Sequence, residues 1–127
     1  MPRVVVDAVH LDQLRAHGGL AGLRDENALE AALARPRHKW AVDGEGDLAT
    51  LAAAYAFAVV TGHPYRDGNK RVAFLTMVVF LGLNGFDFEA PEPEVVTLML
   101  AAAAHRATEA DLASWIGARM VPRPNAP

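Results

Sequence analysis

The residues best suited to chemistry lie together in one stretch near the middle of the chain. The stretch reads His63-Pro64-Tyr65-Arg66-Asp67-Gly68-Asn69-Lys70-Arg71. Histidine can take a proton from a hydroxyl near neutral pH, and a carboxylate can hold Mg²⁺ beside phosphates. A helix N-terminus with nearby cations attracts anions. Together these groups have the parts needed to transfer a phosphate-containing group to a hydroxyl.

Three positions supply the base, the metal ligand and access to the backbone. His63 follows a helix-ending glycine and precedes a proline, so its ring is expected at a loop edge as the general base. Asp67 is a hard oxygen donor suited to Mg²⁺. Gly68 has no side chain and lets a ligand approach the backbone closely.

The next three positions begin a predicted helix. Asn69, Lys70 and Arg71 lie in its first turn, where free N–H groups and the helix dipole favour anions and disfavour cations. Two cations at that end indicate a negative partner. Arg71 offers a bidentate fork for phosphate oxygens, and Lys70 offers a mobile point charge.

Each of these residues also has an ordinary structural explanation. A histidine before proline often hydrogen-bonds at a helix end, and Asp-Gly is a common turn. Asn is a common helix cap, and Lys-Arg is commonly solvated. Taken singly, the structural explanation is favoured for every residue. When the residues are taken together, between two apolar helices, a functional site is as well supported as the structural explanation.

Two apolar segments must position this stretch. Residues 48–61 and 69–83 predict helices, and the first is apolar nearly all round, which is typical of a central helix. Asp47 is expected to cap the first helix, and Gly62 is expected to close it. Pro64 prevents the helix from continuing.

The N-terminal third predicts two further helices. The Val4–Val6 run predicts a short strand or a docked extended segment, after which Asp7 suits a helix N-cap. Gly18-Gly19 is expected to end that helix. A second helix is expected to begin at Asp25, and Pro36 is expected to end it.

The remaining segments complete an all-α fold. Residues 37–46 predict a loop or short hairpin, and residues 86–88 alternate but are too short to predict a strand. A helix is predicted over residues 94–106, and residues 108–111 resemble a capping box that opens a last helix. Residues 122–127 are proline-rich and predict a flexible tail. We expect one compact domain over all 127 residues, with about six helices and two of them central and buried.

Composition narrows the class of protein. The chain is 52% hydrophobic and 21% charged, which fits a globular domain. A net charge of −3 argues against direct nucleic-acid binding. Without cysteine there are no disulfides or thiolate metal sites. The N-terminus lacks a signal-peptide core, and the longest uncharged run, residues 48–65, falls short of the roughly 20 residues that span a bilayer. These features predict a soluble cytoplasmic protein that does not enter membranes.

The central stretch resembles the signature of the Fic/Doc family, His-Pro-Phe-x-Asp/Glu-Gly-Asn-Gly-Arg. Lys70 stands where Fic proteins carry the second glycine, and this Asn-Lys-Arg form resembles the Doc (death-on-curing) branch. Tyr65 replaces the phenylalanine, and its hydroxyl then needs a hydrogen-bond partner or a position at the protein surface. Residues 18–25 and 29–36 resemble the upstream segment of Doc-like proteins, so the resemblance spans most of the chain.

The resemblance implies a role for each matching position and a helical Fic/Doc-type fold. His63 would be the general base on a target hydroxyl, and Asp67 would help to hold Mg²⁺. Gly68 and Asn69 would line the phosphate nest, and Arg71 would bind phosphates. Residues 37–46 occupy the place of a target-docking flap in Fic-fold proteins, although an ordinary surface loop is at least as well supported.

Lys70 decides between two activities. In Fic enzymes the glycine leaves room for the nucleotide pose that transfers AMP, whereas in Doc the lysine accompanies a reversed pose that transfers the γ-phosphate of ATP. The resemblance therefore implies a toxin of a toxin–antitoxin system. It would be a protein Ser/Thr kinase that modifies a hydroxyl of the translation factor EF-Tu, arrests translation and is neutralised by a Phd-like antitoxin.

Three alternatives stay open. A Fic-type AMP-transferase would use the same fold. A non-catalytic phosphate- or nucleotide-binding module would use the same site without chemistry. A metal-dependent hydrolase has less support, because His63 and Asp67 alone are too few ligands for a dedicated metal site. The chain has no Ser/Thr-x-x-x-Glu-Gly/Asn self-inhibitory motif, so inhibition is expected from a separate chain.

Overall fold

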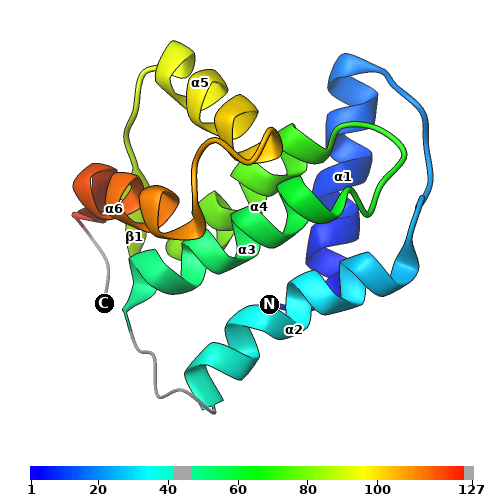
Figure 1. Ribbon diagram of the computed structural model, residues 1–127. Helices are drawn as coiled ribbons and strands as arrows, with labels where there is room; N and C mark the ends of the chain where they lie inside the picture. The colour runs from blue at the N-terminus through cyan, green and yellow to red at the C-terminus, as the bar shows by residue number, and fades with distance from the viewer. Residues whose placement is uncertain (42–46, 125–127) are drawn as a thin grey trace.

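A computed structural model describes residues 1–41 and 47–124, and within them the chain forms six helices and one small sheet (Figure 1). The elements in chain order are α1 (Arg3–His17), α2 (Glu26–Ala41), α3 (Leu48–Gly62), α4 (Asn69–Leu83), β1 (Phe86–Phe88), α5 (Glu92–Ala103), α6 (Glu109–Arg119) and β2 (Met120–Pro122). The predicted all-α fold is confirmed.

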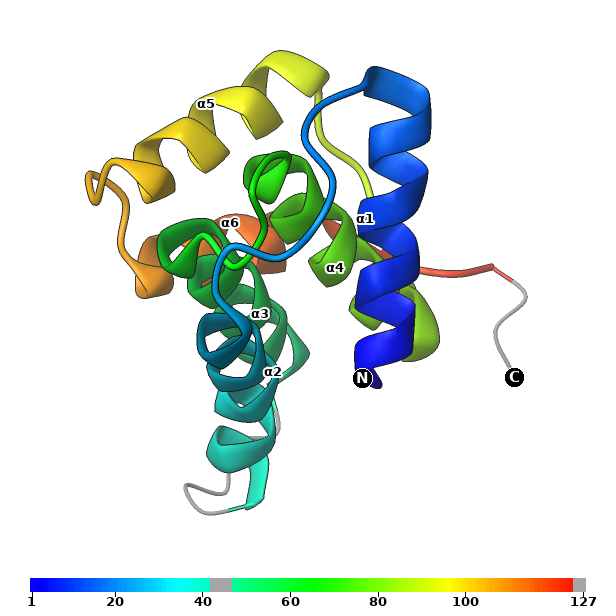
Figure 2. The same ribbon diagram turned by 90° about the vertical axis from the view of Figure 1, so that its right-hand side faces the viewer.

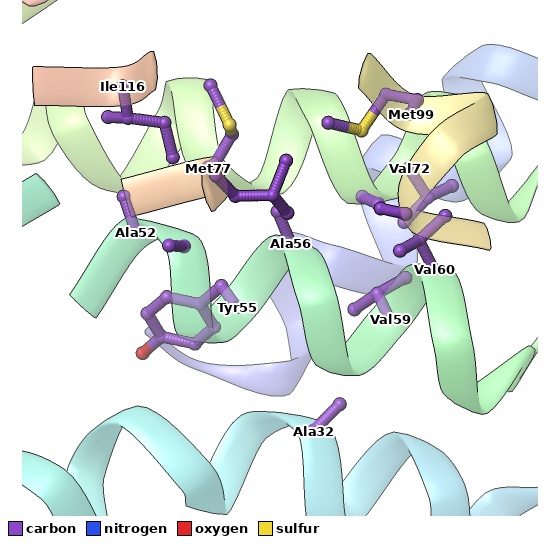
Figure 3. Packing of buried hydrophobic residues seen from close by; sticks show 14 of the residues in the cluster. Ala32, Ala52, Tyr55, Ala56, Val59, Val60, Val72, Met77, Met99 and Ile116 are labelled. Atoms are coloured by element: carbon purple, nitrogen blue, oxygen red, sulfur yellow. The ribbon is translucent and has the colours of Figure 1, made fainter. Parts of the chain in front are cut away.

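Helix α3 lies at the centre of the fold (Figure 1). Nine of its 15 residues are buried, five of them alanines, so neighbouring helices can approach it on several faces. Figure 3 shows Ala32 of α2 on one side of α3, with Met77 of α4 and Ile116 of α6 on the other. The Asp47 carboxylate accepts a hydrogen bond from the Thr50 N–H, so the predicted N-cap is confirmed.

Helix α4 is the second central helix and begins and ends where the sequence predicts. Its buried residues, Val72, Ala73, Thr76, Met77 and Leu81, form one stripe at helical spacing. This stripe packs on α3, while α1 packs against another part of α4 (Figure 2). The end of α3 and the start of α4 are therefore held side by side, which fixes the ends of the loop between them.

The predicted strand at Val4–Val6 is wrong, because α1 already begins at Arg3. Asp7 lies inside this helix, and Pro2 occupies the N-cap position instead. Val6 and His10 are the buried residues of α1, one helical turn apart. Burial against the helical core decides between helix and strand here. A β-branched run favours a strand only weakly, and this preference depends on a neighbouring strand to pack against.

The prediction that Pro36 ends the second helix is also wrong. Helix α2 continues through Pro36 to Ala41. Pro36 is buried, and beyond it Lys39, like Arg35 before it, reaches the Glu109 carboxylate at the start of α6, at 3.4 and 2.8 Å. Packing and these ion pairs offset the one backbone hydrogen bond that a proline removes.

The predicted loop over residues 37–46 is therefore wrong over residues 37–41, which are helical. Residues 42–46, and with them half of the expected docking flap, lie outside the described residues. The last helix begins with the predicted capping box, in which Thr108 and Asp111 exchange hydrogen bonds of 2.8 and 3.0 Å.

A short antiparallel sheet joins two segments that the sequence does not predict to pair. Asp87 of β1 lies opposite Val121 of β2. Pro122 belongs to β2, and the Arg123 guanidinium donates to the Asp87 carboxylate (2.7 Å) and to the Gly82 carbonyl (3.2 Å). Residues 122 and 123 of the predicted flexible tail are therefore paired with other segments, and residues 125–127 lie outside the described part.

Among the described residues, no helix has the length and apolar character needed to cross a membrane.

The packing of α3 gives a stability prediction. Ala56 is fully buried between helices, so Ala56→Leu should lower the free energy of unfolding by about 1–3 kcal/mol through overpacking. Chemical denaturation monitored by circular dichroism would measure the change. Ala110→Leu, at an exposed position of α6, is the matched control and should change stability little. Equal effects of the two substitutions would contradict the central position of α3.

Candidate active site

All the candidate residues lie in the loop from the end of α3 to the first turn of α4. His63 is the C-cap of α3 and adopts a left-handed conformation (φ 47°, ψ 54°). Gly62 is still helical, so the prediction that Gly62 closes the helix is off by one residue. Glycine is the usual residue at a left-handed cap, and another residue there costs roughly 1–2 kcal/mol. Such strain is typical of functional positions.

Arg24 holds the backbone at this histidine. Its Nε donates to the His63 carbonyl oxygen at 2.7 Å, and its Nη2 donates to the Gly62 carbonyl oxygen at 2.9 Å. Its backbone N–H also donates to the Pro64 carbonyl oxygen at 2.8 Å. A guanidinium thus satisfies the last carbonyls of α3, where the helix dipole favours a cation.

The segment between α1 and α2 runs alongside the α3–α4 loop (Figure 2). Leu23 and Tyr65 form an antiparallel bridge, and the Arg66 N–H donates to the Gly22 carbonyl oxygen at 3.1 Å. The backbone of the loop is therefore paired along part of its length, and its conformation is fixed from outside the motif.

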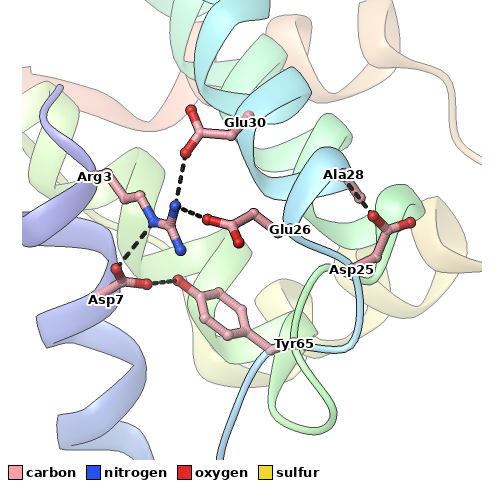
Figure 4. Close-up of polar contacts among 7 residues, drawn as sticks. All are labelled: Arg3, Asp7, Asp25, Glu26, Ala28, Glu30 and Tyr65. Carbon is pink, nitrogen blue, oxygen red and sulfur yellow. Dashed lines mark hydrogen bonds and ion pairs between the residues drawn. The ribbon is translucent and has the colours of Figure 1, made fainter.

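Tyr65 anchors the loop in the core. Its side chain is only 2% exposed, and its ring stacks on the His10 ring at 3.8 Å between centroids, 17° from parallel. Its hydroxyl donates to the Asp7 carboxylate at 2.8 Å, which supplies the partner that a tyrosine here requires (Figure 4). Burial, and then this hydrogen bond, raise the pKa of Tyr65, so the hydroxyl stays protonated as a donor.

Asp7 in turn belongs to a network that joins α1 to α2. Arg3 donates to the Asp7 carboxylate at 3.3 Å and also binds Glu26 and Glu30 of α2 (Figure 4). The tyrosine hydroxyl therefore hydrogen-bonds to a carboxylate that is itself held by a cation. The loop is connected through Tyr65 to both N-terminal helices.

The side chain of Asn69 closes the loop on itself. Its Oδ1 accepts from the Tyr65 N–H at 3.0 Å, and its Nδ2 donates to the Tyr65 carbonyl oxygen at 2.9 Å. Both ends of the amide are thus used by one residue. The backbone N–H of Asn69, in the first turn of α4, is available to a phosphate.

Asp67 is exposed but held at three atoms. Its backbone carbonyl oxygen lies 3.1 Å from His10 Nε2, which must donate because a carbonyl only accepts. Its Oδ1 accepts from the Gly68 N–H at 2.9 Å, and its Oδ2 accepts from the Leu20 N–H at 3.4 Å. The donors are two backbone N–H groups and one imidazole, and none of them neutralises the carboxylate charge.

Asp67 fits Mg²⁺ as a single protein ligand. The described residues contain no group of three or more His, Cys, Asp or Glu side chains that could hold a metal alone. Asp67 is a single exposed carboxylate beside an anion-attracting helix end. It suits a hard cation that brings most of its ligands with it as phosphate and water oxygens.

The first turn of α4 carries two cationic side chains. Gly68 is its N-cap in a left-handed conformation (φ 77°), and no side chain caps the first turn. Lys70 and Arg71 are exposed, and neither side chain makes a hydrogen bond or ion pair with the described residues. Free N–H groups and two free cations at one helix end are a favourable place for a phosphate.

Comparison with known proteins agrees with this geometry. The sequence pattern of the Fic/DOC family matches residues 3–81, which is more than half of the chain and includes α1, α2, α3, the whole loop and all of α4 except its last two residues. The chain belongs to the Fic/Doc family. The resemblance that the nine-residue motif predicts is thus confirmed.

Two relatives within the family are Doc proteins. The chain is 35% identical over 86 residues to the "Protein kinase doc" of Escherichia phage P1, covering 67% of this chain and 68% of that protein. It is 38% identical over 76 residues to the "Toxin Doc" of Mycolicibacterium smegmatis, covering 59% of this chain. It spans 58% of that toxin, which is less than two thirds of its length.

Reasoning from the sequence places every candidate residue in the loop but misses those that hold it. Asp7, His10, Leu20 and Arg24 all lie more than 35 residues before the residue that each contacts. Arg24 and Leu20 fall in the segment whose likeness to Doc-like proteins is the one available signal. His10 gives no signal of its own, because it takes an ordinary buried position on α1.

The Arg24 contacts predict that the loop can be loosened without touching the motif. Arg24→Ala should raise amide hydrogen exchange over residues 62–66 and lower the free energy of unfolding by about 1–3 kcal/mol, the usual range for hydrogen bonds to a charged group. Hydrogen-exchange mass spectrometry would locate the change. Arg106→Ala, at an exposed arginine whose side chain makes no hydrogen bond to the described residues, should leave both quantities unchanged. Unaltered exchange in Arg24→Ala would show that Arg24 does not hold the loop.

Proposed function

We propose that this chain is a Doc-type toxin, a protein Ser/Thr kinase that transfers the γ-phosphate of ATP to a hydroxyl of a translation factor. EF-Tu is the proposed target and translation arrest the proposed result. One observation carries the proposal. The buried or engaged side chains of the motif, Tyr65 and Asn69, hold the loop, while the side chains of His63, Lys70 and Arg71 are exposed and make no hydrogen bond or ion pair with the described residues.

The proposed reaction needs little covalent chemistry from the protein. His63 accepts the proton of the target hydroxyl as the hydroxyl oxygen attacks the γ-phosphorus. A bond forms between that oxygen and phosphorus, and the bond from phosphorus to the β–γ bridging oxygen breaks, which releases ADP. Lys70, Arg71 and the N–H groups of the first turn of α4 would stabilise the phosphate charge, as positioning and charge neutralisation dominate such transfers.

Asp67 would hold Mg²⁺ together with the nucleotide phosphates. The ion would supply neutralisation of phosphate charge when bound. The protein's own contribution is to keep the carboxylate in place, through the hydrogen bonds that His10, Leu20 and Gly68 donate to Asp67.

The names of the two relatives support the toxin assignment, since one is called a protein kinase and the other a toxin. A toxin of this kind needs an inhibitor, and we propose a Phd-like antitoxin acting in trans. The proposed site of action is the cytoplasm, where ATP and translation factors are available. The lysine at position 70, in place of the Fic glycine, favours γ-phosphate transfer over AMP transfer.

Differential labelling tests the reaction. Purified chain incubated with EF-Tu should transfer label from γ-labelled ATP and not from α-labelled ATP. His63→Ala should reduce transfer by about 10²–10⁴-fold, the usual contribution of a general base. Label from the α-phosphate would instead identify an AMP-transferase. Full growth inhibition by His63→Ala, with nucleotide binding intact, would favour a non-catalytic binding module.

A second substitution at the same position controls for folding. His63→Gly removes the same imidazole but suits the left-handed cap, so it should be more stable than His63→Ala by about 1 kcal/mol. Both variants should be equally inactive. A His63→Gly protein that is stable yet inactive would exclude unfolding as the cause of the loss.

Lys70 is tested by two substitutions that differ in backbone freedom. Lys70→Ala and Lys70→Gly both remove the charge, and the glycine also weakens the first turn of α4 by roughly 0.8–1.0 kcal/mol. Each should lower γ-phosphate transfer to EF-Tu by at least about tenfold, equivalent to 1.4 kcal/mol of lost transition-state stabilisation. Phosphate and AMP transfer would be quantified together by intact-protein mass spectrometry. Wild-type rates of γ-transfer in both variants would remove Lys70 from the proposed mechanism.

A further inference from the structure

A turn outside the motif lies directly against the Asp67 carboxylate. It consists of Gly18, Gly19 and Leu20, which follow the end of α1. The Leu20 N–H donates to Asp67 Oδ2 at 3.4 Å. A Cβ added to Gly19 would lie 2.7 Å from the same oxygen and 3.2 Å from Asp67 Cγ.

This contact leaves no room for any side chain at position 19. A separation of 2.7 Å is shorter than real Cβ atoms show, so either the turn or the carboxylate would have to move. The position of Leu14 Cδ2, at 3.3 Å from the same added Cβ, limits the movement of the turn. The carboxylate is the more mobile of the two, because Asp67 is exposed and its Oδ2 is held by one long hydrogen bond.

The turn also selects the orientation of the carboxylate. Oδ2 points at the Leu20 N–H and Oδ1 at the Gly68 N–H, so the carboxylate plane is defined by donors on both sides. Each oxygen keeps further lone-pair directions for a cation. A ligand whose orientation is set by backbone donors does not have to be ordered when the cation arrives.

We propose that Gly19 and Leu20 are positioning residues for Asp67. The turn that they form sets the carboxylate orientation in which Asp67 binds a divalent cation carried by nucleotide phosphates. This inference rests on the proposed function, because it takes Asp67 as the metal ligand. It adds a second segment of the chain, 47 residues before Asp67, to the metal site.

Gly18 provides a matched control for Gly19. Both glycines have positive φ angles, 76° and 117°, which side chains of L-residues rarely adopt. A Cβ at Gly18, however, would have no atom within 4 Å. Gly18→Ala therefore strains the same turn without reaching the carboxylate, and the difference between the two variants isolates the contact with Asp67.

Binding of Mn²⁺ as a paramagnetic probe in the presence of ATP tests the inference without measuring catalysis. Electron paramagnetic resonance should give an apparent affinity about 10–100-fold weaker for Gly19→Ala than for wild type, as expected when a group that orients a metal ligand is disturbed. The apparent Mn²⁺ affinity of Gly18→Ala should remain within about twofold of the wild-type value. Such a difference is too small to represent the loss of a group that orients a metal ligand. Equal Mn²⁺ affinities of the two alanine variants would overturn the inference.

Variants of Asp67 separate this inference from the proposed function. Asp67→Ala should lose the tight Mn²⁺ site, and adding Gly19→Ala to it should weaken binding no further. If Asp67→Ala binds Mn²⁺ with ATP as tightly as wild type, Asp67 is not the ligand, and the metal assignment in the proposed function falls with the inference. If only the Gly19 effect is missing, the proposed function stands and the inference alone is wrong.

Stability measurements keep the test decisive should Gly19→Ala fold poorly. Removing the Asp67 side chain removes the atoms that an added Cβ would meet at 2.7 and 3.2 Å. The double variant Gly19→Ala, Asp67→Ala should therefore melt at a higher temperature than Gly19→Ala alone. A double variant no more stable than Gly19→Ala would show that the two residues are not in contact and would overturn the inference.

Discussion

The burial of one tyrosine ring is the interaction on which the candidate site depends. Tyr65 lies in the middle of the loop between the two central helices, yet its ring packs on His10 of α1 and its hydroxyl reaches Asp7. Burying such a side chain stabilises by roughly 1.5–3 kcal/mol, while fixing each loop residue costs about 1–2 kcal/mol of backbone entropy. One ring cannot order the loop alone. The hydrogen bonds that Arg24 donates to the His63 carbonyl oxygen and Asn69 donates to the Tyr65 carbonyl oxygen are therefore part of the same anchoring arrangement.

The residues that hold the loop and the residues that could react are different ones, and the locally unfavourable features belong to the second group. His63 adopts a left-handed conformation that a glycine would adopt more easily. Lys70 and Arg71 place positive charge at a helix end that disfavours it. Natural sequences break local rules mainly where function requires it, because strain and charge left uncompensated in the free protein are available to a ligand.

The sequence predicted correctly those parts of the fold that depend on residues close together in the chain. The Asp47 cap, the capping box at Thr108 and both central helices depend on residues within a few positions of one another. The errors at residues 4–6 and at Pro36 arose where packing between distant segments outweighed propensity. The same applies to the site: the motif was readable as one stretch, whereas its supports come from α1 and the α1–α2 segment, which only the folded chain brings near.

The proposed choice between phosphate transfer and AMP transfer rests on one side chain, that of Lys70, and not on the backbone of the loop. Either reaction needs a base, a phosphate-binding helix end and a metal carboxylate, and the described backbone of residues 63–71 would serve both. Like His63 and Arg71, Lys70 has a side chain that makes no hydrogen bond or ion pair with the described chain. Its ammonium group is a mobile point charge on a flexible stem and can reach a phosphate, whereas a glycine at this position would have no side chain at all. If the proposed function holds, the fold fixes where the phosphates bind, and position 70 fixes which phosphorus faces the histidine.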